Sequence, residues 1–225
     1  MIQAIIFDLD DTLYPEKDFV ESGYQSVARH VAGCWGYCFD EVFSSMMMSF
    51  NSGGRETVFP DLLLQFPEIT LSLDEFVQIY RKHIPAIHLF PGYRELLRDL
   101  SGKYQLGLIT DGLPEVQKNK VKALGLDIII GNIIYSWEYG FERQKPHPHS
   151  FSVMLELLQS APRNTLFVGD NPEKDGKGAK KVGMLYVQIR HSQEKQFGSG
   201  RAIQETSELI LESLFELPHA LQQWN

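Results

Sequence analysis

The sequence is poor in cysteine and contains no long apolar run. Its two cysteines, Cys34 and Cys38, lie without enough further ligand residues nearby for a metal clip, so we expect free thiols. No segment approaches the roughly 20 apolar residues of a membrane-spanning helix, and the start "MIQAIIFDLD" lacks the basic, apolar and small-residue order of a signal peptide. The sequence therefore predicts a cytoplasmic protein that does not interact with a membrane.

Positive charge is also scarce, because 21 lysines and arginines stand against 29 acidic residues and give a formal net charge of -8. This balance argues against general affinity for nucleic acid or anionic membranes, although it leaves room for a local basic pocket. Apolar residues make up 43% of the chain, which is enough to bury a core. We expect one large globular domain or one domain with an insert, as a monomer or a homodimer.

Short apolar runs alternate with helix-like segments along most of the chain. Continuous apolar runs suit strands that are buried on both faces of a parallel sheet. Their alternation with helices predicts the α/β class, with a Rossmann-like parallel sheet flanked by helices. The predicted strands are 4–7, 106–109, 128–135, 166–168 and 185–189. The predicted helices are 91–102, 114–125, 148–160, 172–183 and a closing helix at 205–217, with an exposed loop at 191–200.

Residues 16–88 break this alternation. Segments 19–33, 39–50 and 73–84 are helix-compatible, and no strand-like run separates them. We therefore predict a core domain of residues 1–15 and 89–225, interrupted after its first strand by a small α-helical cap domain of residues 16–88.

Polar residues follow the predicted strands at the points where these strands end. They are Asp8 and Asp10 after the first strand, Thr110 and Asp111 after the second, and Asp170 and Asn171 after another. Ligands of an open parallel sheet bind beyond the carboxyl ends of its strands, so these side chains should gather in one place. Their oxygen atoms suit a hard divalent cation, and Mg²⁺ fits best. Lys145, held outside a helix by Pro146, adds a positive charge that indicates an anionic substrate group, most simply phosphate.

Four motifs in this order resemble those of the haloacid dehalogenase superfamily, whose members are mostly phosphatases. They are "DLDDTL" from Asp8, Thr110 at a strand end, Lys145 before a proline, and "GDNPEKD" with Asp170 and Asp175. The resemblance extends from about residue 2 to about residue 190, and the helical insert stands where one cap type of that family stands. One departure is the stretch "GFERQKP" before Lys145, which is longer than the family often has.

The resemblance implies roles for these residues. Asp8 is the expected nucleophile, which forms an aspartyl-phosphate, and Asp10 the expected general acid and then base. Mg²⁺ is expected on the Asp8 carboxylate, the Asp10 backbone carbonyl and the Asp170 carboxylate. Thr110 and Lys145 are expected to contact the phosphoryl group.

Further residues are candidates for supporting roles. Asp175 is expected to support the metal site or to orient Lys145, with Asn171 as a second supporting residue. Substrate-binding candidates are Asp111 and Gly112, beside Thr110, and Tyr14 and Glu16, at the expected hinge into the cap.

The function that follows is a Mg²⁺-dependent phosphatase acting on a small phosphorylated metabolite such as a sugar phosphate, a nucleotide or a phospho-acid. A cap over the site disfavours folded proteins and long polymers as substrates. A phosphomutase is the main alternative, because it shares Asp8, Asp10 and the metal. A haloacid dehalogenase is less consistent with Asp10 and Asp170, and a non-catalytic phospholigand-binding module is less consistent with an intact catalytic set.

Overall fold

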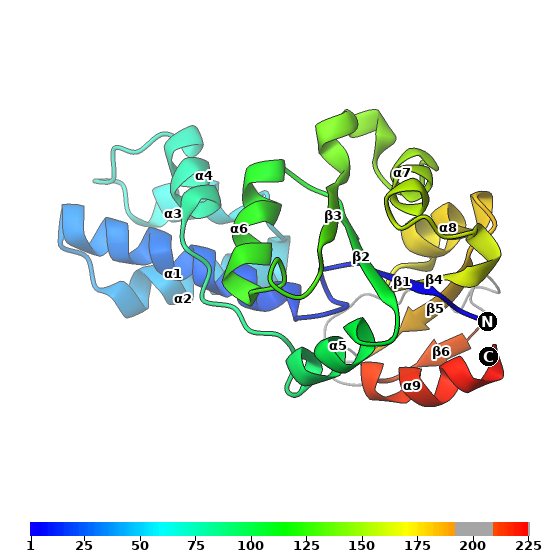
Figure 1. Ribbon diagram of the computed structural model, residues 1–225. Helices are drawn as coiled ribbons and strands as arrows, with labels where there is room; N and C mark the ends of the chain where they lie inside the picture. The colour runs from blue at the N-terminus through cyan, green and yellow to red at the C-terminus, as the bar shows by residue number, and fades with distance from the viewer. Residues whose placement is uncertain (192–208, 225) are drawn as a thin grey trace. The chain divides into compact units, whose positions relative to one another are not determined.

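The structure is a computed structural model that describes residues 1–191 and 209–224 (Figure 1). The chain divides into two compact units, one of residues 1–15 together with 88–225 and one of residues 16–87. Among the described residues, the first unit holds all six strands and the second is helical. The strands are β1 (Ala4–Phe7), β2 (Gln105–Thr110), β3 (Asn132–Tyr135), β4 (Thr165–Gly169), β5 (Leu185–Ile189) and β6 (Leu209–Leu211).

The described strands form a single parallel sheet in the order β3-β2-β1-β4-β5-β6. Strand β1 lies between β2 and β4, and Phe7 is paired with Leu108 on one side and Val168 on the other. The residues that follow these three positions therefore come out at the same edge of the sheet. The predicted α/β fold with a Rossmann-like parallel sheet is confirmed.

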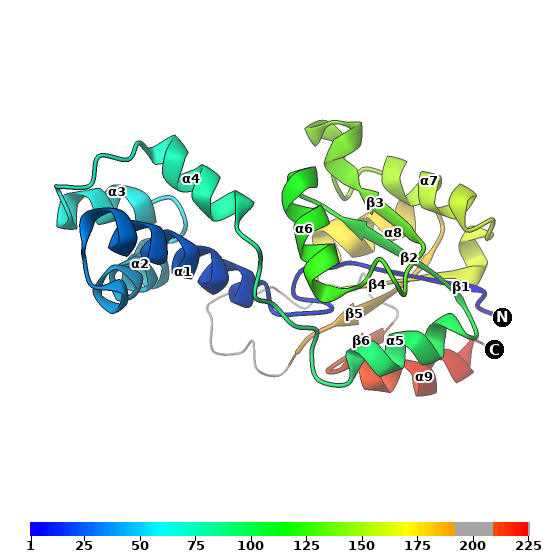
Figure 2. The ribbon, with the colours of Figure 1, turned by 60° about the vertical axis from the view of Figure 1, so that its left-hand side comes forward.

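Helices cover both faces of this sheet (Figure 1 and Figure 2). Their bounds are α5 (Tyr93–Ser101), α6 (Pro114–Leu124), α7 (His149–Leu157), α8 (Lys177–Lys181) and α9 (Leu217–Ala220). Phe151 and Met154 of α7 are fully buried and pack with Phe167 of β4 in one apolar cluster. Helix α8 covers the same face, and both views show α5 and α9 on the opposite face. Single turns complete the unit: η1 (Ser136–Tyr139), η2 (Phe141–Arg143), η3 (Pro162–Asn164), η4 (Pro172–Gly176), η6 (Leu214–Glu216) and η7 (Leu221–Gln223).

Helix α6 shows how local sequence sets the bounds of an element. Pro114 stands in its first turn, where the missing N–H removes no helical hydrogen bond. Gly125 follows its last residue with φ +63°, a left-handed conformation that suits glycine, and donates its N–H to the Lys122 carbonyl. The helix consequently begins and ends within one residue of the predicted range.

The second unit is a bundle of α1 (Glu16–Trp35), α2 (Phe39–Gly53), α3 (Val58–Gln65) and α4 (Leu73–Lys82). Its core is rich in aromatic rings, with Tyr24 against Phe59 and Tyr80 at centroid distances of 6.2 and 5.4 Å. Helix α4 begins at a reciprocal cap in which Ser72 and Glu75 bond each other's backbone N–H groups. Helix α3 was not predicted, because its eight residues include Pro60, which is tolerated only because it lies in the first turn.

Two sequence predictions differ from the structure near the C-terminal half. The closing helix predicted at 205–217 is wrong at residues 209–211, which form the edge strand β6 beside β5, and only the turn η6 and the start of α9 are helical in its described part. An unpaired β5 edge offers a hydrogen-bonding partner that outweighs helix propensity in this apolar stretch. The helix at 172–183 is interrupted, because η4 forms a π-type turn before α8. Residues 192–200 of the predicted loop and residues 205–208 of the predicted closing helix lie outside the described residues.

The cysteines and the apolar content of the helices agree with the sequence analysis. Cys34 and Cys38 are free and exposed, as predicted. Within the described ranges, no helix combines the length and the apolar character that crossing a bilayer requires.

Truncation of the buried face of α7 should destabilise the first unit. Met154 is fully buried, so Met154→Ala leaves a cavity and should lower the free energy of unfolding by about 2–5 kcal/mol. Leu157 on the same helix is 51% exposed, and Leu157→Ala should cost less than about 1 kcal/mol. Urea denaturation of both variants measures the difference, and equal losses would contradict the assignment of α7's buried face.

Candidate active site

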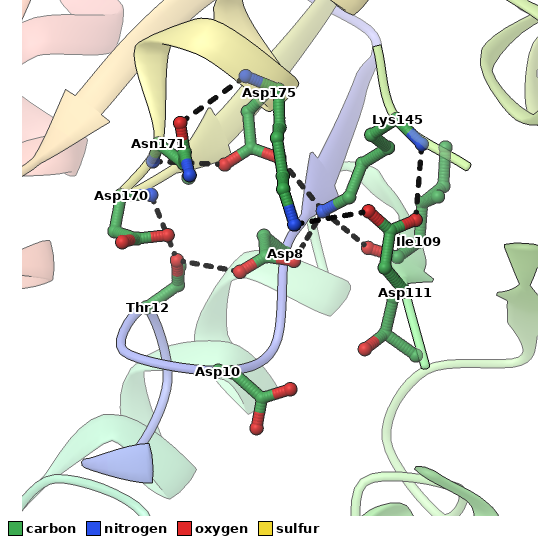
Figure 3. A network of polar contacts seen from close by, with 12 residues as sticks. Asp8, Asp10, Thr12, Ile109, Asp111, Lys145, Asp170, Asn171 and Asp175 are labelled. Carbon is green, nitrogen blue, oxygen red and sulfur yellow. Dashed lines mark hydrogen bonds and ion pairs between the residues drawn. The ribbon is translucent and has the colours of Figure 1, made fainter. Parts of the chain in front are cut away.

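The carboxyl ends of the three central strands bring the predicted site residues together (Figure 3). Asp8 follows β1 directly, Thr110 is the last residue of β2, and Asp170 follows β4. Lys145 comes from the loop between η2 and α7 and points into the same place. All four residues belong to the first unit, and Asp8, Thr110 and Lys145 are buried.

Lys145 forms the centre of a buried ion network. Its Nζ lies 2.5 Å from Asp8 Oδ1 and 2.7 Å from Asp175 Oδ1, and it also donates to the Ile109 carbonyl at 3.4 Å. One ammonium thus pairs with two carboxylates that are themselves buried. Burial of an ammonium is unfavourable unless it is paired in this way. The contact with Asp175 matches the expectation that Asp175 orients Lys145.

Electrostatics in this network favour a protonated Asp8 in the absence of a further cation. Burial raises the pKa of Asp8 from 3.8 to about 7, the Lys145 ammonium opposes this rise, and the Asp175 carboxylate adds to it. Burial lowers the pKa of Lys145, but Asp175 and Asp8 outweigh burial and raise this pKa well above its ordinary value. Lys145 therefore stays charged, while Asp8 lacks full compensation for its negative charge.

Thr12 links the first and last motifs. Its hydroxyl donates to Asp8 Oδ2 at 3.2 Å and accepts from the backbone N–H of Asp170 at 3.0 Å. Asn171 donates its backbone N–H to Asp175 Oδ2 at 3.1 Å, and its side chain accepts from two N–H groups of η4. These bonds set the orientation of Asp8 and Asp175 relative to the strand ends.

Asp8, Asp170 and Asp175 have the arrangement of a metal site. Oxygen atoms from these three carboxylates lie within 4.8 Å of one another. Three carboxylates and the Lys145 ammonium leave an excess of two negative charges, which one divalent cation balances. An all-oxygen donor set with this charge fits Mg²⁺. Asp8 and Asp170 were predicted ligands, and Asp175 joins them in this group.

The carboxylate of Asp10 lies elsewhere and points away from Lys145 (Figure 3). Its Oδ1 accepts from Lys120 Nζ at 2.7 Å and from the Tyr14 hydroxyl at 2.5 Å, and its Oδ2 accepts from Gln117 Nε2 at 2.9 Å. Burial raises the pKa of Asp10, but the Lys120 charge and these hydrogen bonds outweigh it, so the pKa is lowered. The carboxylates of Asp8 and Asp10, which the sequence places together at the strand end, thus have different partners, and a role of Asp10 in metal binding through its backbone carbonyl stays a prediction.

Sequence reasoning missed Gln117 and Lys120. Their spacing of three residues on a predicted helix places them on one face, and that helix follows directly after the strand that ends at Thr110. A glutamine and a lysine on a helix face are usually solvated, so the pattern alone did not distinguish them from surface residues.

The predicted substrate-binding residues have different surroundings. Tyr14 is fully buried and donates its hydroxyl to Asp10, so it supports Asp10 and does not offer a surface to a substrate. Asp111 Oδ1 accepts from Ser136 Oγ at 2.5 Å and from the Lys145 backbone N–H at 3.2 Å, which ties down the loop that carries Lys145. Glu16 lies in the second unit, where it pairs with Arg55 at 2.9 Å.

Gly112 follows Asp111 in a backbone conformation that favours glycine. Its φ is +127°, and a Cβ added there would lie 3.3 Å from the Gln117 side chain. This residue therefore leaves space for Gln117, and its predicted contact with a substrate stays a prediction.

Comparison with known sequences identifies the family. The model described as "Haloacid dehalogenase-like hydrolase" matches residues 5–189. The chain belongs to this family. The resemblance inferred from the four motifs is therefore confirmed.

Individual relatives agree with this assignment. The chain is 29% identical over 226 residues to a glyceraldehyde 3-phosphate phosphatase of Methanocaldococcus jannaschii, with 96% of each chain covered. It is 32% identical over 139 residues to a phosphoserine phosphatase of Thermus thermophilus, covering 60% of this chain and 54% of that one. The crystal structure of a HAD phosphatase from Thermococcus onnurineus shares the fold, with a TM-score of 0.63, 23% identity and 98% of each chain covered. The predicted enzyme class, a phosphatase of this family, is confirmed.

The raised pKa of Asp8 predicts how stability depends on pH in metal-free protein. Between pH 3.8 and about 7 the folded state holds a proton at Asp8 that the unfolded chain has released. The contribution of Asp8 to stability is therefore full below this window and lost as pH rises through it. An asparagine at this position does not ionise, so the Asp8→Asn variant should gain thermal stability relative to the wild type as pH rises.

Thermal unfolding in a chelator at about pH 5 and about pH 8 measures this change. Asp99→Asn, which alters an exposed carboxylate, is the matched control and should show no such trend. A difference between Asp8→Asn and wild type that is the same at both pH values would contradict the assignment.

Proposed function

We propose that the protein is a Mg²⁺-dependent phosphatase that cleaves a small phosphate monoester through an aspartyl-phosphate on Asp8. The observation that carries the proposal is the buried group in which Lys145 contacts both Asp8 and Asp175, with the Asp170 carboxylate close to the same two acids. A carboxylate attacks a phosphate dianion only if negative charge on both is compensated. This group supplies one fixed cation and the ligands for a second.

The carboxylates of Asp8, Asp170 and Asp175 are the residues that would hold Mg²⁺. When bound, the ion neutralises charge on the phosphoryl oxygens and on these acids. Lys145 Nζ, already placed beside Asp8, pairs with the phosphoryl group during transfer. The hydroxyl of Thr110, at the end of β2, donates a hydrogen bond to a phosphoryl oxygen.

In the proposed reaction, an Asp8 oxygen forms a bond to phosphorus while the bond from phosphorus to the leaving oxygen breaks. Asp10 gives a proton to that leaving oxygen and afterwards removes one from the water that hydrolyses the aspartyl-phosphate. The ion pair with Lys120 favours ionised Asp10, which suits the second step. Negative charge of a bound phosphate raises the pKa of a neighbouring carboxyl, and this favours the protonated form needed in the first step.

The relatives narrow the class of substrate. A glyceraldehyde 3-phosphate phosphatase aligns over almost the whole chain, whereas the phosphoserine phosphatase aligns over a shorter part. We therefore propose short-chain phosphorylated aldehydes and acids, with glyceraldehyde 3-phosphate as the first compound to test. The helical unit of residues 16–87 is proposed as the lid that selects among them.

Activity should depend on Asp8, Asp10 and Mg²⁺. Release of phosphate from para-nitrophenyl phosphate and from glyceraldehyde 3-phosphate should require Mg²⁺, and Asp8→Asn should lower kcat by about a thousandfold or more because the nucleophile is lost. Asp10→Asn should act most strongly on the aldehyde phosphate, whose alkoxide leaves only with a proton. Asp127→Asn, at an exposed position, is the control.

Unchanged turnover in Asp8→Asn would refute the mechanism. Release of chloride from a chlorinated acid would instead favour a dehalogenase, and isomerisation of a sugar phosphate without net phosphate release would favour a phosphomutase.

Metal binding should be visible without turnover. Addition of Mg²⁺ should raise the Tm of the wild type by a few degrees, since a ligand at about 100 times its Kd stabilises by roughly 2.7 kcal/mol. Asp170→Asn and Asp175→Asn remove oxygen ligands and should abolish most of this shift. Glu173→Gln alters an exposed acid of the same turn as Asp175 and should retain it. A full shift in both site variants would place the metal elsewhere.

A further inference from the structure

Two buried polar side chains of α6 contact the proposed catalytic residues, and only the charge of one of them, Lys120, has entered the mechanism so far. Gln117 and Lys120 are 2% and 3% exposed, and their spacing of three residues places them on the same face of the helix. Residues of these types are seldom fully buried unless they are hydrogen-bonded or paired. Lys120 reaches Asp10, which follows β1, and Gln117 reaches both Asp10 and Thr110, the last residue of β2.

Gln117 bonds two residues of the proposed catalytic set. Its Nε2 donates to Asp10 Oδ2 at 2.9 Å and to Thr110 Oγ1 at 2.5 Å. The primary amide nitrogen has two protons and no acceptor capacity, so both are used here. An ionised carboxylate only accepts, and the contact with Asp10 is consistent with the amide nitrogen facing this way.

This arrangement determines what the Thr110 hydroxyl can do. A hydroxyl has one proton to donate, and Thr110 Oγ1 accepts from Gln117. The proton of Thr110 is consequently directed to another acceptor. A phosphoryl oxygen accepts hydrogen bonds only, so Gln117 prepares Thr110 as a donor to phosphate.

Asp10 is held by three donors. Lys120 Nζ and the Tyr14 hydroxyl both bond Oδ1, and Gln117 bonds Oδ2. A carboxylate has about four acceptor directions, so among the described residues one direction on Oδ2 remains for a reacting proton. Gly112 supports the arrangement, because a Cβ there would lie 3.3 Å from Gln117.

We propose that Gln117 and Lys120 are positioning residues for phosphoryl transfer: Lys120 holds the Asp10 carboxylate in one orientation, and Gln117 joins it to Thr110 by donating one N–H to each. The inference rests on the proposed roles of Asp10 and Thr110. In this proposal, helix α6 links Asp10, which transfers the proton, to Thr110, which binds the phosphate.

The role of Lys120 is tested by changing the leaving group. An alkoxide departs only with a proton, whereas the nitrophenolate of para-nitrophenyl phosphate departs without one. Lys120→Met should therefore lower kcat/KM for glyceraldehyde 3-phosphate by about tenfold more than for para-nitrophenyl phosphate. Lys120→Arg, which keeps the donor, should recover part of the loss. Lys122→Met, at an exposed position of the same helix, is the control.

A structural role alone would lower kcat/KM for both esters equally, and this result would overturn the proposal for Lys120. A double-mutant cycle gives a second reading, because Lys120→Met should cost little in an Asp10→Asn background. Full additivity of the two losses would also count against it.

The role of Gln117 is tested by binding of inorganic phosphate in the presence of Mg²⁺, measured by calorimetry without turnover. Gln117→Glu keeps the size of the side chain but turns a donor into an acceptor, which repels Asp10 and draws the Thr110 proton inward. The Kd for phosphate should rise about tenfold in Gln117→Glu and less in Gln117→Met. Neither change should weaken binding further in a Thr110→Val background.

Phosphate binding in Gln117→Glu and Gln117→Met that equals the wild type would overturn the proposal for Gln117, provided that circular dichroism shows folded variants. The binding assay also tests the role of Gln117 independently of the proposed phosphatase activity. Wild-type protein that binds phosphate but hydrolyses none of the esters would refute the proposed function, while the effect of Gln117 on phosphate binding would still be decided.

Discussion

The site depends on one buried ammonium, Lys145, which lies between Asp8 and Asp175. Without it, two buried carboxylates would be left uncompensated, and loss of one partner of a buried pair costs about 3–5 kcal/mol. In the proposed reaction, the same contact reduces the repulsion between the Asp8 carboxylate and an approaching phosphate. Stability and the proposed chemistry therefore depend on the same interaction, and burial together with Asp175 still raises the pKa of Asp8 despite the Lys145 charge.

Two acids only two positions apart in the chain have opposite electrostatic surroundings. Asp8 shares its cation with Asp175 and has a raised pKa, whereas Asp10 has Lys120 and two further donors and a lowered pKa. Carboxylates with pKa values moved apart are suited to different tasks. The two carboxylates have different partners, because Lys120 and Gln117 of α6 bond Asp10 whereas Lys145 bonds Asp8. Asp10 then faces α6 while Asp8 faces Lys145.

Much of the fold, and the gathering of the candidate site residues at one edge of the sheet, was predictable from the sequence. The strands of a parallel sheet are apolar on both faces, so continuous apolar runs such as 4–7 and 185–189 predict strands. The polar residues that follow such runs indicate the edge of the sheet where ligands bind. Less was predictable where tertiary pairing competes with local propensity. Residues 209–211 are compatible with a helix, but the exposed edge of β5 makes them a strand.

By itself, the sequence determined the order of the first five strands, the positions of Asp8, Asp170 and Lys145 at strand and loop ends, and membership in the family through motifs that need only local spacing. The tertiary structure decided which side chains meet. Tyr14 is a supporting residue of Asp10 because packing buries it, and Gln117 and Lys120 are site residues because the parallel crossover from β2 brings α6 against the end of β1. The contacts of Gln117 and Lys120 with Asp10 join residues more than 100 positions apart, and no local pattern specifies a partner at that separation.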